Sequence, residues 1–193
     1  MGLFEELDAP DRAGQEICRA ELRALHATID LEVARLAARH RARMRCTIGC
    51  NACCADDLTV TSIEADRIRS AHPDLLARGR PHAPGACAFL DEKGACRIYA
   101  DRPSVCRSQG LPLRALVENE LDEIEERRDI CPVNLAGGPP VDVLREDDCW
   151  LVGPAELKLR SLDDRFVAAA GGGRGSRDDA DERVPLRSLF ARD

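Results

Sequence analysis

The sequence predicts a small α+β domain that is rich in cysteine, has short strands, and is flanked by an N-terminal amphipathic helix and a C-terminal helix. The chain has 193 residues but only six aromatic residues, so the large side chains that usually dominate a core are scarce. Scaffolds that bury little apolar area often use disulfides or structural metals to offset conformational entropy. Eight of the ten cysteines fall within one stretch, at Cys46, Cys50, Cys53, Cys54, Cys87, Cys96, Cys106 and Cys131. The predicted fold class is therefore a small metal-stabilised α+β cysteine-rich domain.

The N-terminal extension, residues 1–45, is expected to form one helix over residues 12–44. Apolar residues recur at steps of three and four, which is the period of one helical face, at Leu22, Leu25, Ile29, Val33, Leu36, His40 and Met44. We expect this face to pack on the cysteine-rich domain or on its copy in a homodimer. A protein partner bound through this helix is thus one expectation.

The other side of this predicted helix is rich in arginine. Residues 12–45 carry eight arginines against four acidic residues, although the whole chain has a net charge of −7. Nucleic acid is not favoured as a partner, because no aromatic residues interleave with the arginines for base stacking. An adaptor that captures a protein partner in a salt-sensitive manner is a further alternative.

Targeting signals are not evident in the sequence. The N-terminus lacks the charged start and the apolar stretch of a signal peptide, and no apolar run approaches transmembrane length. We therefore expect a cytoplasmic protein with no membrane partner.

The cysteine-rich domain is expected to span residues 46–150. Leu58-Thr-Val is a candidate short strand, and Thr61-Ser-Ile-Glu64 matches a capping box that opens a helix through about Ser70. His72-Pro73 then ends this helix.

A small hairpin is expected to present the next two cysteines. Asp91-Glu-Lys-Gly94 predicts a turn between Cys87-Ala-Phe-Leu and Cys96-Arg-Ile-Tyr99. Cys87 and Cys96 would then lie on neighbouring strands. Cys106 comes shortly after Pro103, which is consistent with the first turn of a helix.

The last part of the chain predicts two more helices. Residues 113–128 are a candidate for a strongly acidic helix with Leu116, Leu121 and Ile124 as its few apolar anchors. After a glycine and proline linker at 137–140, residues 151–170 predict a C-terminal helix. Residues 171–193, which begin with a glycine-rich run, are expected to form a flexible tail.

Clustered cysteines in a reducing compartment favour metal or redox chemistry over a disulfide framework. Deprotonated sulfur is soft and anionic, and four thiolates complete a tetrahedral shell around zinc or iron. The eight clustered cysteines divide into two such shells, so all eight are candidate metal ligands.

The spacing of these cysteines fits neither of two common templates. Only Cys50-Asn-Ala-Cys53 has the interval of a zinc knuckle. The chain has a Cys131-Pro132 pair as ferredoxins do, but the doublet Cys53-Cys54 breaks the ferredoxin run. Adjacent side chains of an extended segment point to opposite faces. The doublet could therefore supply two different centres, which we favour, or one cysteine could ligate while its neighbour packs.

Several other residues have both a chemical and a structural interpretation. Cys18 and Cys149 lie outside the cluster and are expected to be buried packing residues. Arg97, Arg102 and Arg107 could donate hydrogen bonds to thiolates or serve as surface residues, with Arg102 paired to Asp101 or Asp91. Tyr99 is expected to be a core anchor and His82 a loop histidine. The weaker candidates for metal ligands are His26, His40 and His72.

Five segments together resemble the YkgJ-type cysteine-cluster family. They are Cys50-Asn-Ala-Cys53-Cys54, Cys87-Ala-Phe-Leu, Gly94-Ala-Cys96-Arg-Ile-Tyr99, Arg102-Pro-Ser-Val-Cys106-Arg107 and Cys131-Pro132. The resemblance covers residues 46–132, and the family is described as chelating zinc or iron through eight characteristic cysteines. The chain departs from the family pattern in having three residues between Cys46 and Cys50 and an alanine after Cys87. The resemblance implies that all eight cysteines are metal ligands.

The leading functional hypothesis is a cytoplasmic protein that chelates zinc or iron, including an iron–sulfur centre, in a structural, redox or sensing role. It makes no claim of catalysis. The alternative is a protein-lysine N-methyltransferase, because a related architecture occurs in flagellin lysine N-methylases. The sequence lacks a recognisable glycine-rich motif for an adenosyl cofactor, which argues against this alternative.

Overall fold

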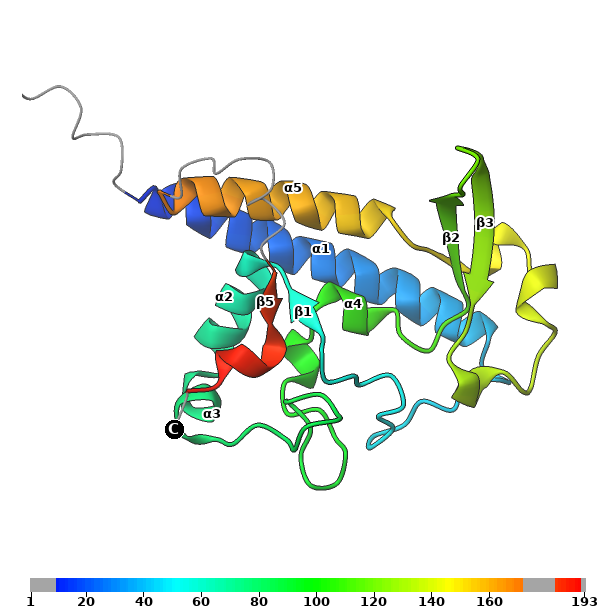
Figure 1. The fold of residues 1–193 in the computed structure, drawn as a ribbon, viewed down its shortest axis with the longest axis horizontal. Helices are drawn as coiled ribbons and strands as arrows, with labels where there is room; N and C mark the ends of the chain where they lie inside the picture. The colour runs from blue at the N-terminus through cyan, green and yellow to red at the C-terminus, as the bar shows by residue number, and fades with distance from the viewer. Residues whose placement is uncertain (1–9, 172–182, 192–193) are drawn as a thin grey trace, which may run out of the picture.

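The computed structural model describes residues 10–171 and 183–191, and its two longest helices lie side by side along one edge of the molecule (Figure 1). Helix α1 spans Arg12–Arg39 and helix α5 spans Pro154–Ala169. Asp11 caps the start of α1, because its Oδ1 accepts a hydrogen bond from the Gly14 backbone N–H at 2.9 Å. Both predicted helices are confirmed, although α1 ends at Arg39 and not at residue 44.

The apolar face of α1 is covered within the same chain. Side chains of α1, α2 and α5 form one buried cluster, which contains Cys18, Leu22, Ile63, Leu159, Leu162 and Phe166. An ion pair between Arg165 and Glu21 ties α5 to α1 at the surface. Among the described residues of α1, the exposed large apolar side chains are Ile17 and Leu31. The helix thus meets its packing requirement without a second copy of the chain.

Helix α2, Ser62–Ala71, begins at the predicted capping box. The Thr61 backbone N–H donates to Glu64 Oε2 at 3.4 Å, and Glu64 is buried in the first turn. His72 caps the end of α2, and the short helix α3, Pro73–Arg78, follows directly. The predicted start and end of this helix are confirmed.

The core of the cysteine-rich region is completed by residues from the far end of the chain. Strand β1, Thr59–Val60, pairs antiparallel with strand β5, Val184–Pro185. The Phe190 ring lies 5.0 Å from the Phe89 ring, and both side chains are buried. Residues 183–191, which the sequence assigned to a tail, therefore lie in this core, whereas residues 172–182 of that tail fall outside the described part of the chain.

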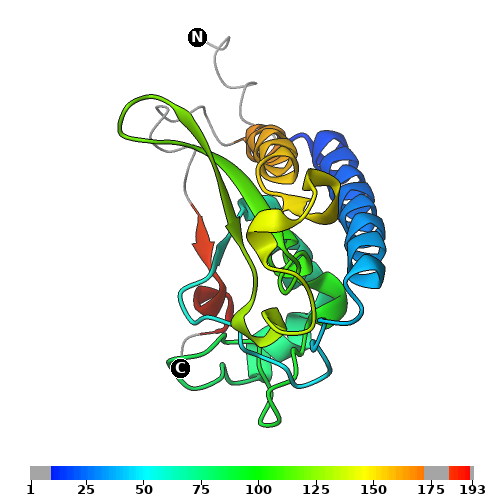
Figure 2. The ribbon, with the colours of Figure 1, turned by 90° about the vertical axis from the view of Figure 1, so that its right-hand side faces the viewer.

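The predicted acidic helix over residues 113–128 is wrong. Strands β2, Leu113–Glu118, and β3, Ile124–Asp129, form an antiparallel hairpin that projects from the body of the molecule (Figure 2). Asp122 adopts a φ of 59° in the connecting turn. Across the strands, Arg114 pairs with Glu126 at 3.0 Å, so acidic residues that suggested a helix serve as partners for arginine. The expected anchors Leu116, Leu121 and Ile124 are all exposed.

Strand β4, Trp150–Leu151, joins this hairpin to the helical layer. It pairs in parallel with β2, with Trp150 opposite Leu113. Trp150 also belongs to a buried cluster with α1 residues, which contains Ile29, Leu36, Leu111, Trp150 and Ala155. The chain therefore folds as an α+β protein with five short strands and five α-helices among the described residues.

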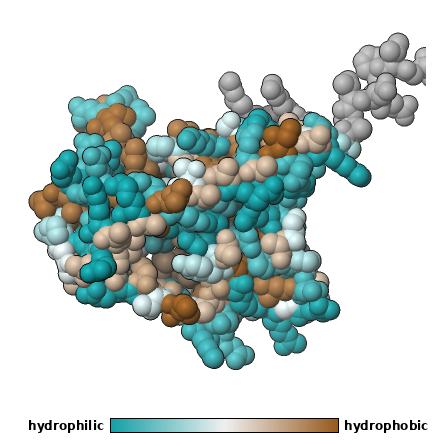
Figure 3. All heavy atoms as spheres, turned by 180° about the vertical axis from the view of Figure 1, so that it is seen from behind, coloured by the Kyte–Doolittle hydropathy of each residue, from teal (hydrophilic) through white to brown (hydrophobic). Residues whose placement is uncertain are grey.

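The surface seen from behind is mainly hydrophilic, with hydrophobic residues scattered in small groups (Figure 3). Tyr99, expected as a core anchor, is 65% exposed, and the Arg102 guanidinium lies 4.2 Å from the centre of its ring. None of the helices in the described part of the chain is both long enough and apolar enough to cross a membrane.

Candidate metal centre

The loops that carry most of the clustered cysteines lie on the side of α1 opposite to α5 (Figure 1). The dense run from Cys46 to Cys54 is folded by two successive turns. The Cys50 backbone N–H donates to Thr47 O, and the Cys54 N–H donates to Asn51 O, both at 2.9 Å. These turns bend the run back on itself.

The loop with Cys87 and Cys96 is joined directly to this run. The Cys87 backbone N–H donates to Cys54 O at 3.0 Å. A single antiparallel bridge links Leu90 to Cys96, and Asp91 Oδ1 accepts backbone N–H groups of the intervening turn at 2.8 Å. The predicted hairpin is thus present as one bridge and a tight turn.

The last two cysteines lie in or next to regular elements. Cys106 lies on helix α4, Ser104–Arg107, and this helix begins directly after Pro103 as expected. The start of α4 is fixed by Glu64, whose Oε1 accepts the Ser104 backbone N–H at 2.7 Å. Cys131 follows β3 and precedes the 3-10 helix η2, Pro132–Asn134.

Four cysteines share one electrostatic neighbourhood, which we call group one: Cys46, Cys50, Cys53 and Cys131. Burial raises the pKa of Cys46, and negative charge on the other three thiols raises it further. The Asn134 side-chain N–H opposes this shift by donating to Cys46 Sγ at 3.4 Å. Cys46 and Cys53 are exposed and the other two are half-buried, so group one lies at the surface.

The other four cysteines form group two: Cys54, Cys87, Cys96 and Cys106. Burial raises the pKa of Cys106 to about 12, and the charges of Cys87 and Cys96 add to this shift. Burial likewise raises the pKa values of Cys87 and Cys96. Cys87 is buried and the other three are half-buried, so group two is the more enclosed.

The doublet Cys53-Cys54 connects the two groups. The Cys54 thiol donates a hydrogen bond to Cys53, which lowers the pKa of Cys53 to about 6 and raises that of Cys54. The pKa of Cys54 also responds to Cys87 and Cys106, while Cys53 acts on Cys46. Cys53 also acts on Cys106 of group two, so the supply of two centres by this doublet stays a prediction.

The thiols are neighbours without forming closed coordination shells. Across residues 10–171 and 183–191, no three cysteine, histidine, aspartate or glutamate side chains lie close enough together to enclose a metal ion. The donor set itself suits zinc or iron, because each group offers four sulfur atoms. The fit to a metal therefore rests on the chemistry and grouping of the donors.

The three arginines beside the cysteines bond mainly to other groups. Arg97 donates to the carbonyls of Arg80 and Ala88 at 2.8 Å. Arg102 and Arg107 both pair with Asp30, at 3.4 and 2.5 Å. The charges of Arg102 and Arg97 nevertheless oppose the burial that raises the pKa of Cys96. The hydrogen bonds and ion pairs of these arginines therefore hold the fold, and the charges of Arg97 and Arg102 also limit the rise in the pKa of Cys96. Arg102 pairs with Asp30, and not with Asp101 or Asp91 as predicted.

Three of the four histidines have partners outside the cysteine groups. His26 Nε2 lies 3.1 Å from Ser104 Oγ, His40 Nε2 lies 2.6 Å from Asp148 O, and His72 Nε2 lies 2.9 Å from Asp101. His82 is half-buried on its loop, as expected. Cys18 and Cys149 are buried, which confirms them as packing residues.

Two contributors to the region were missed by sequence reasoning. Asn134 is fully buried and holds Cys46 Sγ, Gly110 O and the Arg45 backbone N–H together. Arg187 acts on the Cys87 thiol and donates to the carbonyl of Ala86 at 3.0 Å. Neither residue stands in a motif. Asn134 follows Cys131 closely in the chain, but its contact with Cys46, like that of Arg187 with Cys87, is made only through long-range folding.

Comparison with known proteins identifies the cysteine-rich region. Residues 45–132 match the CxxCxxCC family, described as a "Putative zinc- or iron-chelating domain". The matched segment contains all eight clustered cysteines, and the predicted resemblance is confirmed over these residues. No curated protein and no solved structure gave a significant match to the chain.

Proposed function

Because residues 45–132 match the CxxCxxCC family, we propose that this protein binds zinc or iron through its eight clustered cysteines, four in group one and four in group two. The observation that carries the proposal is the family match, which contains all eight clustered cysteines. The influences among the thiols that shift the pKa values of Cys46, Cys54 and Cys106 support the division into two groups. We further propose a cytoplasmic location, since a reducing compartment keeps clustered thiols available as ligands.

Thiolate chemistry explains why a cation would be held here. Burial is the first cause of the raised pKa values of Cys46, Cys87, Cys96 and Cys106, and the negative charge of neighbouring thiols adds to the shift at Cys46, Cys96 and Cys106. A divalent cation among them offsets this mutual repulsion and favours the deprotonated ligands. When bound, zinc would crosslink the loops, whereas an iron–sulfur centre would add one-electron redox chemistry.

A structural role for the metal follows from the loops themselves. The run from Cys46 to Cys54 and the loop from Arg80 to Ile98 contain no helix and no paired strand beyond one bridge. Segments without regular structure gain order from crosslinks such as a bound metal. Group two, which lies next to the core residue Phe89, is the better placed to hold the fold, while the exposed group one is accessible for redox or sensing chemistry.

The metal is identified by purification under anaerobic conditions. A colourless protein with stoichiometric zinc supports zinc binding. A brown protein with acid-labile sulfide and charge-transfer absorption supports an iron–sulfur centre. A protein that contains neither metal after reconstitution with each would refute the proposal.

The two-group assignment is tested with matched cysteine variants. Cys50→Ser should lose the metal of group one, Cys87→Ser that of group two, and the double variant both. Cys149→Ala is the control, because this cysteine is buried outside both groups. Loss of all metal in either single variant would replace two centres with one shared centre, and unchanged metal content in both would refute the ligand assignment.

A further inference from the structure

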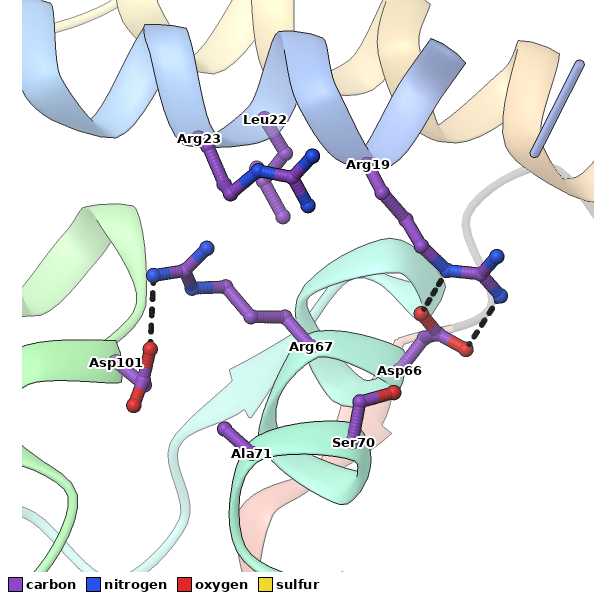
Figure 4. Close-up of a pocket in the computed structure, with 8 residues that line it drawn as sticks. All are labelled: Arg19, Leu22, Arg23, Asp66, Arg67, Ser70, Ala71 and Asp101. Atoms are coloured by element: carbon purple, nitrogen blue, oxygen red, sulfur yellow. Dashed lines mark hydrogen bonds and ion pairs between the residues drawn. The ribbon is translucent and has the colours of Figure 1, made fainter. Parts of the chain in front are cut away.

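A cavity of about 220 Å³ lies between α1 and α2, away from the cysteine groups (Figure 4). A water molecule occupies about 30 Å³ in the liquid, so the space admits a small ion together with solvent. The lining is dominated by charged side chains, with three arginines against two aspartates, and consists of Arg19, Leu22, Arg23, Asp66, Arg67, Ser70, Ala71 and Asp101.

Arg19 forms a wall of this cavity and is already neutralised. Its Nε and Nη2 atoms donate to the two carboxylate oxygens of Asp66 at 2.8 and 3.2 Å. This bidentate pair is drawn in Figure 4, and it raises the pKa of Arg19. Arg19 and Asp66 therefore shape the site and contribute little net charge to it.

Arg23 and Arg67 are placed differently, because their side chains enter the space between α1 and α2 from opposite sides (Figure 4). Arg23 meets Glu16 only at 3.5 Å, and the Arg23 side chain is 53% exposed. Arg67 donates to one carboxylate oxygen of Asp101 at 2.8 Å, and His72 Nε2 lies 2.9 Å from the other oxygen. The guanidinium groups of Arg23 and Arg67 thus line one cavity, and nearby carboxylates neutralise their positive charge only in part.

One donor in this cavity wall is left without a partner. The Nε of Arg67 is buried and makes no hydrogen bond among the described residues. Leaving a buried charged donor unsatisfied is costly, so an acceptor at this place stabilises the fold. The positive charges of Arg102 and Arg67 also act on the nearby guanidinium of Arg107, whose pKa is lowered first by burial and then by these charges.

We propose that this cavity binds a small oxyanion of the phosphate class between the guanidinium groups of Arg23 and Arg67. Phosphate oxygens accept charge-assisted hydrogen bonds from several guanidinium groups at once, which a single acceptor cannot do. The Ser70 hydroxyl lines the same space and supplies a neutral donor. This site is separate from the cysteine groups and does not depend on bound metal.

The test uses calorimetric titration of the full-length, metal-loaded protein with inorganic phosphate at low ionic strength. Saturable binding is expected, with a loss of at least about tenfold in affinity for Arg23→Gln and for Arg67→Gln. Arg78→Gln is the matched control, because it removes the same charge from an exposed arginine paired with Asp74. Arg23 is the decisive position, since its exposed side chain can be changed without disturbing the core.

A second variant predicts a change of opposite sign. Glu16→Gln removes the carboxylate that competes for Arg19 and Arg23, so phosphate affinity should rise by about 2–5-fold. Glycerol phosphate binding more tightly than inorganic phosphate indicates a phosphate monoester, and the reverse order indicates the free ion. Equal binding of acetate, the absence of saturable binding, or equal weakening by Arg78→Gln would overturn the proposal.

Discussion

Replacing Glu64 with glutamine tests how the cysteine-bearing helix α4 is held in place. The Glu64 carboxylate is 2% exposed and receives donors from three elements. It accepts the Ser104 backbone N–H at 2.7 Å and the Thr61 hydroxyl at 3.2 Å, and it lies 3.5 Å from His26 Nε2. The substitution keeps the side-chain shape but removes the charge and places an amide N–H2 against these donors.

The expected cost follows from the number and kind of these bonds. A hydrogen bond to a charged group contributes about 1.5–3 kcal/mol, and a buried donor left without a partner costs about 1–3 kcal/mol. Because glutamine retains one acceptor oxygen, we expect Glu64→Gln to lower the free energy of unfolding by about 2–3 kcal/mol. For a chain of this size, that corresponds to a fall in Tm of roughly 4–12 °C.

The pH dependence gives a second readout. Burial alone would raise the pKa of Glu64, but hydrogen bonds from His26 and Ser104 outweigh it and the pKa is lowered from 4.5. A carboxyl with a depressed pKa stabilises the fold above its ordinary pKa and loses this contribution as the pH falls through the folded value. Wild-type stability should therefore fall below about pH 4.5 more steeply than that of Glu64→Gln.

Urea unfolding at fixed metal loading, followed by circular dichroism from pH 3 to 7 in steps of roughly one unit, measures both effects. Glu16→Gln provides the control, because this carboxylate is exposed. A variant as stable as the wild type within about 0.5 kcal/mol, with the same acid limb, would show that Glu64 does not organise α4.

Three other predictions concern the core, a glycine and the metal. Phe190→Ala should destabilise the protein by about 3–5 kcal/mol in chemical unfolding, because Phe190 packs on Phe89, and full stability would disprove this packing. Gly110→Ala should lower metal content, because a Cβ there would lie 2.7 Å from Cys46 Sγ. Gly85→Ala is the control, because Gly85 also has a positive φ but a Cβ there meets no other atom. Equal metal loss in both variants would contradict the role of the contact with Cys46. Chelation of the metal should lower Tm reversibly, and an unchanged Tm in the metal-free protein would refute a structural role.

The helices that are well marked in sequence were predicted because their signals are local. The apolar period of residues 12–44 depends on one face of one helix, and the Thr61–Glu64 capping box is complete within four residues. Only the end of α1 was misplaced, since His40 caps the helix that the apolar pattern continued to Met44. Side chains beyond the end of a helix can also be buried, so the apolar pattern alone does not show where the helix ends.

The β2–β3 hairpin was missed because its stabilising contacts are made across strands. Glu126 is consistent with an acidic helix until its partner is known. It lies opposite Leu116 in the hairpin and pairs diagonally with Arg114, which is on the other side of the turn. A local signal was available at the turn, where Asn119 Oδ1 accepts the backbone N–H groups of Leu121 and Glu123. An asparagine such as Asn119, together with an aspartate of positive φ three residues later, Asp122, is typical of a turn.

The candidate ligands were found from sequence, but their grouping was not. The doublet Cys53-Cys54 left two alternatives open, of which two separate centres was favoured. Cys53 acts on Cys46, and Cys54 responds to Cys87 and Cys106, but the assignment of the doublet to two centres stays a prediction. The partners of each cysteine depend on contacts such as that of Cys87 with Cys54, which join residues far apart in the chain. Metal spacing rules describe ligands within one loop, and here the ligands come from four segments.

The pairing of β1 with β5 has a consequence for the order of assembly during synthesis. Strand β5 and Phe190 are translated roughly 50 residues after Cys131, which at about 5–20 residues per second is a delay of several seconds. Until then, Val60 and Phe89 lack the residues that cover them, and the nearby thiols of group two remain open. The metal that we propose for group two can therefore reach these thiols before the core closes, and arrival of the C-terminal segment then encloses them.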